Sequence, residues 1–512
     1  MKTLQLDGSS LTLDDLAPLA RGERLRLEVA EKALPRVQAS RDKVDRHVAA
    51  GDVVYGLTTG FGKLKNTAVA AGQLEDLQRN LVLSHSVGVG DPMPLHEVRL
   101  AQVLRLNSLL VGVSGVRVEL VQALARLFNA DFVPEVPQQG SVGASGDLAP
   151  LSHMVAAYMG FGHATVGGER LDAGKALERC GEAPLVLKAK EGLGLINGTE
   201  IMKAIGVCNV LRATNLSKAA EAIAALSVEA LFGSSRPFQE RLSELRPHAG
   251  GARAAANMRA CLAGSEVLKS HADCDRVQDP YSLRCVPQIH GAFKSALAHV
   301  TEVLVSELNA VTDNPVVDAV RDEVYSAGLF HGQPLSTTQD YLGMAACTLA
   351  NVSERRVEQM VNPDLSGGLP AFLVAEPGLN SGLMIAQYTA AALASENKSL
   401  AHPASVDTVP TSAGQEDHVS MGVTAARKTR QILTQVEQGL GIELVCAGQA
   451  REFHSDLRAG VGAEAAYAAL RKYVAPLDRD RYLAPDLAAG AQLVASGELV
   501  AAVERAAGPL AS

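Results

Sequence analysis

Residues 289–311 read IHGAFKSALAHVTEVLVSELNAV, and this stretch decides the fold class. Its large apolar side chains recur at steps of four or three residues, at Ile289, Phe293, Leu297, Val300, Leu304, Leu308 and Val311. This spacing places one apolar stripe along a helix of about six turns. Thr312-Asp313-Asn314-Pro315 follows and ends the helix. A stripe of this length predicts a helix that packs against other long helices.

The rest of the chain repeats this pattern. Long helices are expected over residues 200–232, 334–361, 381–400 and 417–446, and further helical patterns cover residues 12–50, 73–87, 99–129 (interrupted at 112–115) and 151–159. Gly167-Gly168 indicates a small hairpin. The predicted fold is mainly α. One compact body is expected, with a loop-rich N-terminal region over residues 1–200 and a long-helix bundle over residues 201–512.

Composition narrows the possible classes of protein. The chain has 512 residues, 47% hydrophobic and 20% charged, which suits a soluble protein with a large core. A net charge of −9 without a basic cluster argues against nucleic-acid binding. The seven cysteines include no C-x-x-C pair, so neither a disulfide framework nor a metal site is expected. With no apolar N-terminal segment or membrane-spanning run, the expected location is the cytoplasm.

The stretch GSVGASGDLAP, residues 140–150, matches no common site motif. A phosphate-binding loop requires Lys after its last glycine, and a nucleophile elbow requires Gly two residues after its serine; Asp147 occupies both places. Its composition predicts a tight turn before a helix that begins near Asp147, with Pro150 in the first turn. Ala144-Ser145-Gly146 also permits a rarer reaction. The Gly146 nitrogen can attack the Ala144 carbonyl with loss of one water, and Ser145 can lose a second water, which gives an electrophilic methylidene-imidazolone ring.

Five further stretches accompany this triplet, and all six occur in the order of one known family. They are YGLTTGFG at 55–62, NLVLSH at 80–85, EGLGLINGT at 191–199, VQDPYSLRC at 277–285 and QEDHVSM at 415–421. Together with the triplet they resemble the aromatic amino acid ammonia-lyases and aminomutases over nearly the whole chain. Ser84-His85 resembles the selectivity pair of the members that act on histidine. Phenylalanine and tyrosine lyases usually have Phe-Leu or His-Leu there.

The resemblance implies the catalytic groups. Ala144, Ser145 and Gly146 would form the methylidene-imidazolone, so no external cofactor is expected. The amine is a poor leaving group and the β-proton is not acidic, so elimination needs this electrophile to capture the substrate and a base to remove the proton. Tyr55 would be that base, and a cationic substrate or a helix N-terminus could lower its pKa. Tyr281 would position or protonate groups around the electrophile.

The resemblance also implies the substrate-binding groups. Arg284 would hold the carboxylate in a bidentate pair. Asn197 and Gln278 would donate hydrogen bonds to the carboxylate or to the electrophile's oxygen. His85 and Glu416 would recognise the imidazole, which both donates and accepts, and Glu416 has a possible catalytic role in moving protons. Phe330 would line the pocket.

Each of these residues has a simpler interpretation when it is considered alone. The three aromatic residues would simply pack, at Tyr55, Tyr281 and Phe330. Arg284 would form a salt bridge, and Asn197-Gly198 would form a turn. The acidic triplet Glu416-Asp417-His418 would be the first turn of a helix. The chain departs from the family pattern at two places. Leu329 replaces an asparagine within Ala327-Gly328-Leu329-Phe330, and Gly414 replaces an asparagine before Gln415.

The expected function is elimination of ammonia from L-histidine to give trans-urocanate. A phenylalanine or tyrosine lyase or aminomutase is the second hypothesis, and a non-catalytic helical oligomer is the third. The resemblance implies a homotetramer with active sites shared between subunits. No nucleic-acid or membrane partner is expected.

Overall fold

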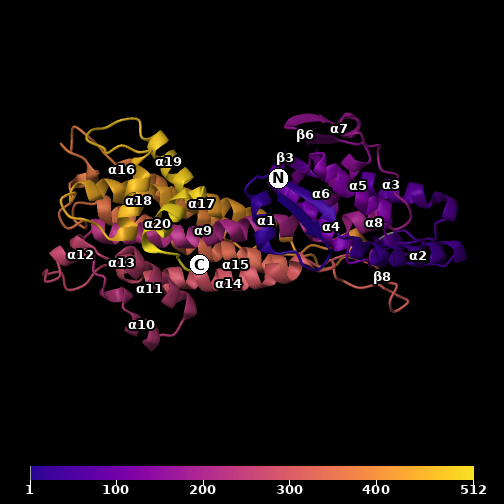
Figure 1. Ribbon diagram of the computed structural model, residues 1–512, viewed down its shortest axis with the longest axis horizontal. Coiled ribbons are helices and arrows are strands. Elements are labelled where there is room, and N and C mark those ends of the chain that lie inside the picture. Colours follow the sequence, from indigo (N-terminus) through magenta and orange to yellow (C-terminus); the bar gives the residue numbers. More distant parts are fainter. Residues whose placement is uncertain (1, 61) are drawn as a thin grey trace. The chain divides into compact units, whose positions relative to one another are not determined.

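Long helices dominate the computed structural model, which describes residues 2–60 and 62–512 (Figure 1). The apolar stripe forms α14 (Val286–Leu308), which ends three residues before Val311. The other predicted long helices are confirmed as α9 (Glu200–Ala230), α15 (Gln333–Val361), α16 (Met384–Leu400) and α17 (Gly422–Glu452). The start of α17 corrects the prediction, because a loop occupies residues 417–421.

The chain forms two compact units, each built from three segments. The first comprises Met1–Cys208, Thr301–Gln339 and Pro403–Arg427, and the second comprises Asn209–Val300, Asp340–His402 and Lys428–Ser512. Both units are discontinuous in sequence, because each of the helices α9, α14, α15 and α17 contributes residues to both. The division near residue 200 that the sequence suggests remains a prediction.

Charged pairs hold the long helices of the second unit together. Arg356 of α15 donates to Glu443 of α17 at 2.8 Å, and both side chains are fully buried. Arg212 of α9 donates to Glu437, also on α17, at 2.7 Å. The three helices lie side by side in Figure 1. Buried charge requires such pairing, because an isolated ion would lose its hydration without compensation.

The N-terminal part of the first unit begins with a parallel strand pair, β1 (Lys2–Leu6) and β2 (Leu25–Val29). The uninterrupted helical pattern predicted over residues 12–50 is therefore wrong. Helices α1 (Leu13–Ala20) and α2 (Leu34–Ala50) flank β2. Leu25 and Leu27 are buried and alternate with exposed charged residues, which is the period of a strand.

The other predicted N-terminal elements are confirmed. They are α3 (Leu74–His85), α4 (Leu95–Leu109), α5 (Val118–Asn129), α6 (Leu148–Tyr158) and the hairpin of β6 (His163–Val166) and β7 (Glu169–Asp172). The short elements of the first unit are β3 (Val89–Pro92), β4 (Val133–Pro134), β5 (Pro137–Gln139), α7 (Ala173–Cys180), α8 (Glu191–Ile196), β8 (Val316–Asp318) and β9 (Glu323–Tyr325). Those of the second are α10 (Glu240–Leu245), α11 (Ala249–Cys261), α12 (Glu266–Ser270), α13 (Tyr281–Arg284), α18 (Val461–Arg471), α19 (Ala484–Ala495) and α20 (Glu498–Ala507).

Within the described residues, no single helix has the length and hydropathy of a membrane span. The bent pair α19 and α20 has that length and hydropathy only when the two helices are counted together.

Candidate active site

The Ser145 loop is a tight turn held against a second loop. Ser145 and Gly146 have φ of 46° and 83°, in the left-handed region. The Gly198 N–H donates to the Ser145 carbonyl at 3.0 Å, and the Asp147 N–H donates to the Gly198 carbonyl at 2.7 Å. A Cβ on Gly146 would overlap that same Gly198 carbonyl. Only glycine fits at position 146, for both conformational and steric reasons.

Asp147 fastens this loop to the start of α9. Its carboxylate accepts hydrogen bonds from the N–H groups of Ile201 at 2.8 Å and Met202 at 3.0 Å. These N–H groups belong to the first turn of α9, which has no intrahelical acceptors for them. Burial raises the pKa of Asp147 to about 8, while the two N–H groups favour its charged form. The predicted helix start near Asp147 is confirmed, although its side chain caps a different helix.

Two cavities of about 370 and 700 Å³ adjoin the Ser145 loop in the first unit. Both are lined by Tyr55, Gly62, Ser145, Leu193 and Glu416. Asn197 and Phe330 line the smaller cavity, and Ser84 and His85 line the larger one. The structure therefore brings together six predicted site residues from widely separated stretches: Tyr55, His85, Ser145, Asn197, Phe330 and Glu416. Phe61, in the loop predicted over 55–62, lies outside the described residues.

Tyr55 is half-buried in the loop after α2. Burial raises its pKa above 10.0, and the Glu416 carboxylate raises it further, while a hydrogen bond with the Gly62 backbone opposes them. The side chain is therefore a neutral phenol at neutral pH. Among the described residues the net effect is a raised pKa, so a base at Tyr55 requires a nearby cation.

His85 ends α3 with a defined ring orientation. The Ser84 hydroxyl donates to the Leu81 carbonyl at 3.1 Å and lies 3.0 Å from His85 Nδ1. Because Ser84 has only one proton to donate, its oxygen accepts from Nδ1–H. Burial lowers the pKa of His85 below 6.5, while the Leu81 carbonyl and Glu416 oppose this shift. The ring is therefore neutral, and Nε2 is its hydrogen-bond acceptor.

Glu416 lies in the loop before α17. Its Oε2 accepts from the Thr411 hydroxyl at 2.7 Å, and the two residues pair through their backbones. The interpretation of Glu416-Asp417-His418 as a helix first turn is wrong, because α17 begins at Gly422. The carboxylate instead faces the same cavities as Tyr55 and Ser145.

Gln278, Tyr281 and Arg284 belong to the second unit, and none of them lines the two cavities. Tyr281 is 69% exposed, and the Arg284 guanidinium lies over its ring at 4.5 Å. Arg284 donates through Nε to the Asp279 carbonyl at 2.8 Å. Among the described residues it pairs with no carboxylate, which disfavours the structural salt-bridge interpretation.

The two departures from the family pattern lie outside the walls of the cavities. Leu329 is 50% exposed and lines neither cavity. Gly414 has φ of 82°, and a Cβ there would meet no atom within 4 Å. Glycine suits this backbone, and asparagine is one of the few other residues that adopts it readily.

Sequence reasoning missed a group of buried charged residues behind the Ser145 loop. Glu200 accepts from Arg105 at 3.3 Å and Lys203 at 3.2 Å, and Lys190 pairs with Asp313 at 2.7 Å. All five side chains are at most 1% exposed. The available signal was charge within apolar runs, as in Leu104-Arg105-Leu106. The smaller cavity is also lined by Lys65, Asn66, Asn314 and Ser326, which carried no motif.

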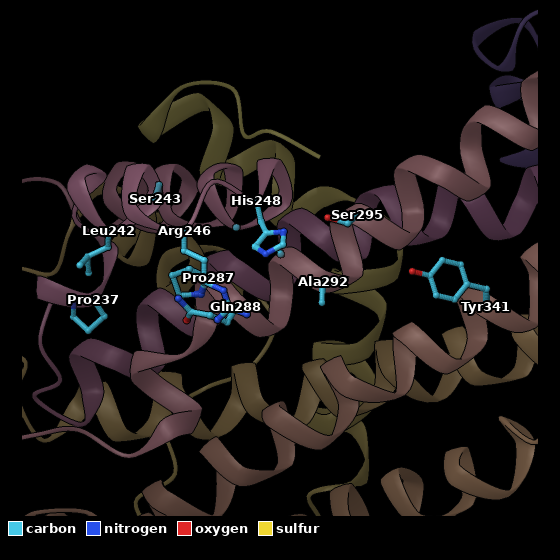
Figure 2. A pocket seen from close by; sticks show the side chains of 12 residues that line it. Pro237, Leu242, Ser243, Arg246, His248, Pro287, Gln288, Ala292, Ser295 and Tyr341 are labelled. Carbon is cyan, nitrogen blue, oxygen red and sulfur yellow. The ribbon is translucent and has the colours of Figure 1, made fainter.

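Two other features of the described residues share no lining residue with these two cavities. A cavity of about 290 Å³ in the second unit has Pro237 and Leu242 at one end and Tyr341 at the other, as Figure 2 shows. His96, Glu97 and Cys208 place potential metal-ligand atoms within 4.8 Å of one another. His96 and Glu97 lie in the first turn of α4, where the positive end of the helix dipole disfavours a cation.

Known proteins match almost the entire chain. Residues 11–472 match the family described as aromatic amino acid lyase. Histidine ammonia-lyase of Myxococcus xanthus (strain DK1622) is 50% identical over 502 residues, 98% of each chain. The crystal structure of histidine ammonia-lyase from Trypanosoma cruzi has a TM-score of 0.91 at 40% identity and covers 99% of this chain and 95% of that one. Tyrosine aminomutase from Streptomyces globisporus has a TM-score of 0.92 at 36% identity, with 98% and 99% covered.

Proposed function

The chain belongs to the aromatic amino acid lyase family, and we propose that it eliminates ammonia from L-histidine to give trans-urocanate. It is an ammonia-lyase, as are its curated relatives at about half identity. The observation that supports histidine as the substrate is that His85 and Glu416 line a cavity that Ser145 also lines. Two acceptors, His85 Nε2 and the Glu416 carboxylate, match an imidazolium, in which both nitrogens donate, while a neutral imidazole would donate to one of the two.

The Ala144-Ser145-Gly146 segment fits the proposed methylidene-imidazolone. Gly146 has no side chain to hinder its nitrogen, which donates to the Gly143 carbonyl at 3.2 Å. The backbone contacts with Gly198 hold both sides of the triplet, and the buried Asn197 Oδ1 has no hydrogen-bond partner among the described residues. The ring supplies an electrophile for the substrate's amine or aromatic ring.

The residues of the chain supply the rest of the reaction. Tyr55 takes the β-proton, so that the Cβ–H and Cα–N bonds break, a double bond forms and ammonia leaves. The substrate's ammonium group lowers the pKa of Tyr55 and offsets the negative charge of Glu416. His85 and Glu416 fix the imidazole, and Phe330 closes the pocket. Arg284 binds the carboxylate, with Gln278 and Tyr281 beside it.

We propose a homotetramer in which one subunit supplies Tyr55, His85 and Glu416 and another supplies Gln278, Tyr281 and Arg284. The exposure of Tyr281 supports this arrangement, as does the Arg284 guanidinium, which pairs with no carboxylate among the described residues. The seven cysteines are free thiols, which supports a reducing compartment such as the cytoplasm. No nucleic-acid partner or membrane attachment enters this proposal.

The alternatives are less well supported. A carboxylate at Glu416 would have no partner on a phenyl ring, which argues against phenylalanine as substrate. A non-catalytic oligomer was favoured only by Leu329, and that side chain lies outside both cavities.

Ammonia release from L-histidine, L-phenylalanine and L-tyrosine, offered separately, tests the proposal. We expect release from histidine alone, with rising urocanate absorbance and an intact mass lower by two waters. Ser145→Ala should keep the unmodified mass and lose turnover. Release from phenylalanine or tyrosine instead would refute the assigned substrate, and an unmodified wild-type mass would refute the electrophile.

A further inference from the structure

Asp279 lies two residues before Tyr281 and five before Arg284, and it is only 8% exposed. Its Oδ2 accepts from the Ser234 N–H at 2.6 Å, and its Oδ1 accepts from the Arg276 guanidinium at 3.4 Å. All of these residues belong to the second unit. A buried carboxylate needs such donors to replace the water that it loses. Asp279 therefore holds this stretch of the chain in one place.

The segment to which Asp279 is anchored directly follows α9. Ser234 comes four residues after Ala230, the last residue of this helix. Arg276 also donates, at 2.8 Å, to the carbonyl of Leu231. Carbonyls at the C-terminal end of a helix lack intrahelical donors and attract cations. The stretch from Arg276 to Asp279 is thus fixed to the end of α9 at two points.

Arg284 depends on the backbone of Asp279 for its orientation. Its Nε donates to the Asp279 carbonyl at 2.8 Å, and its Cζ lies 4.5 Å from the centroid of the Tyr281 ring. Its terminal nitrogens, Nη1 and Nη2, have no hydrogen-bond partner among the described residues. A guanidinium holds a carboxylate through two parallel N–H donors. Because Nε is already engaged, the pair formed by Nη1 and Nη2 is the one that remains.

We propose that Asp279 is a positioning residue for Arg284. By fixing its own carbonyl, Asp279 holds the Nε of Arg284 and leaves Nη1 and Nη2 to bind the substrate's carboxylate. This inference rests on the proposed function, which assigns the carboxylate to Arg284. It adds the residue that determines which edge of the guanidinium is presented. The alternative is that Asp279 stabilises the loop without any effect on Arg284.

Two inhibitors that each lack one substrate group report on the binding of the carboxylate. Imidazolepropionate has the imidazole and the carboxylate, whereas histamine has the imidazole and the amine. In Asp279→Ala we expect the inhibition constant of imidazolepropionate to rise about tenfold, while that of histamine changes by less than about twofold. Equal losses for both inhibitors, or no loss for imidazolepropionate, would overturn the inference.

A double-variant cycle separates an effect that acts through Arg284 from a general loss of structure. Arg284→Ala alone should also weaken imidazolepropionate selectively. When Asp279→Ala is added to Arg284→Ala, we expect a further weakening of less than about twofold, because the group that Asp279 positions is gone. A full additional loss of about tenfold in the double variant would refute the positioning role.

Asp279→Asn keeps the inference testable if Asp279→Ala does not fold. It retains the shape of the side chain and one oxygen, so that Ser234 keeps an acceptor while the contact with Arg276 is lost. We expect a selective loss for imidazolepropionate of about threefold, between the wild type and Asp279→Ala. A ratio of the two inhibition constants equal to that of the wild type would refute the inference.

Asp480→Ala is the control, matched in the kind of contact that it removes. Asp480 also anchors a loop of the second unit, because its carboxylate accepts from the N–H groups of Ser381 and Gly382, each at 2.8 Å. It should leave the inhibitor ratio unchanged, and a changed ratio would show that loosening of any such loop explains the effect. Intact mass confirms ring formation in every variant. A wild-type enzyme that releases no ammonia from histidine would refute the proposed function, whereas a wrong inhibitor pattern in an active enzyme refutes only this inference.

Discussion

At the residue scale, Tyr55 has the property that most constrains the chemistry. A base has to be deprotonated when it acts, yet burial and the Glu416 carboxylate both raise the pKa of Tyr55. The free enzyme therefore holds a phenol, and in the proposed reaction the cationic substrate would provide the charge that favours the phenolate. Deprotonation would in this way be coupled to substrate binding.

We predict that Tyr55 in the free enzyme titrates above pH 10.0, and that Glu416→Gln moves its midpoint downward. The sign follows from charge, since removal of a neighbouring negative charge makes the phenolate easier to form. The tyrosinate absorbance of each protein, minus that of its Tyr55→Phe counterpart, gives the midpoint. A midpoint below 10.0, or one that Glu416→Gln raises, would contradict the assigned environment.

His85→Leu should raise the KM for L-histidine by about tenfold or more, because an imidazole hydrogen bond inside the cavity would go unmade. Ser84→Ala leaves Nε2 in place and removes only the hydroxyl at Nδ1, so it should have a smaller effect. Steady-state kinetics of both variants provide the check. An unchanged KM and kcat in His85→Leu would remove His85 from the site.

At the element scale, the Ser145 loop depends on close backbone packing against Gly198. Gly146→Ala should prevent this packing, lower the melting temperature and block the loss of two waters. Gly168→Ala is a matched control, because Gly168 also has positive φ (86°) but a Cβ there meets nothing within 4 Å. We expect the control substitution to lower the free energy of unfolding by only about 1–2 kcal/mol, because of backbone strain. Thermal unfolding and intact mass distinguish the two, and equal behaviour would contradict the importance of the Gly198 contact.

Helix periodicity explains which elements the sequence could predict. α14 and α9 were predicted because their apolar residues follow the helical period over many turns. β2 was missed because its five residues, Leu25–Val29, lie between two charged helical patterns. The start of α17 was misplaced because an acidic turn resembles a helix N-terminus, whereas the Thr411 contact holds Glu416 in a loop.

At the scale of the whole molecule, the proposed site residues fall into two groups. Tyr55, His85 and Glu416 lie in the first unit, and Gln278, Tyr281 and Arg284 lie in the second. The proposed tetramer combines the two groups from different subunits. Tyr55→Phe and Arg284→Ala should therefore each lose most activity as homo-oligomers.

Mixed oligomers of these two variants should regain part of the wild-type activity, because some of their sites would combine an intact Tyr55 with an intact Arg284. Co-expression with two different affinity tags isolates the mixed species for an ammonia-release assay. The separately purified variants, combined without subunit exchange, are the control. Mixed oligomers no more active than this control would contradict shared sites.

The sequence by itself determined the helical class, the main long helices and the stretches that carry chemistry, because periodicity and motif spacing are local properties of the chain. Tertiary structure alone decided that Tyr55, His85, Asn197 and Glu416 line cavities beside Ser145, since their stretches are far apart in sequence. It also decided that Asp147 caps α9 and that Asp313 accepts a hydrogen bond from the Asn197 amide. Hydrogen-bond partners and burial depend on neighbours that no local pattern specifies.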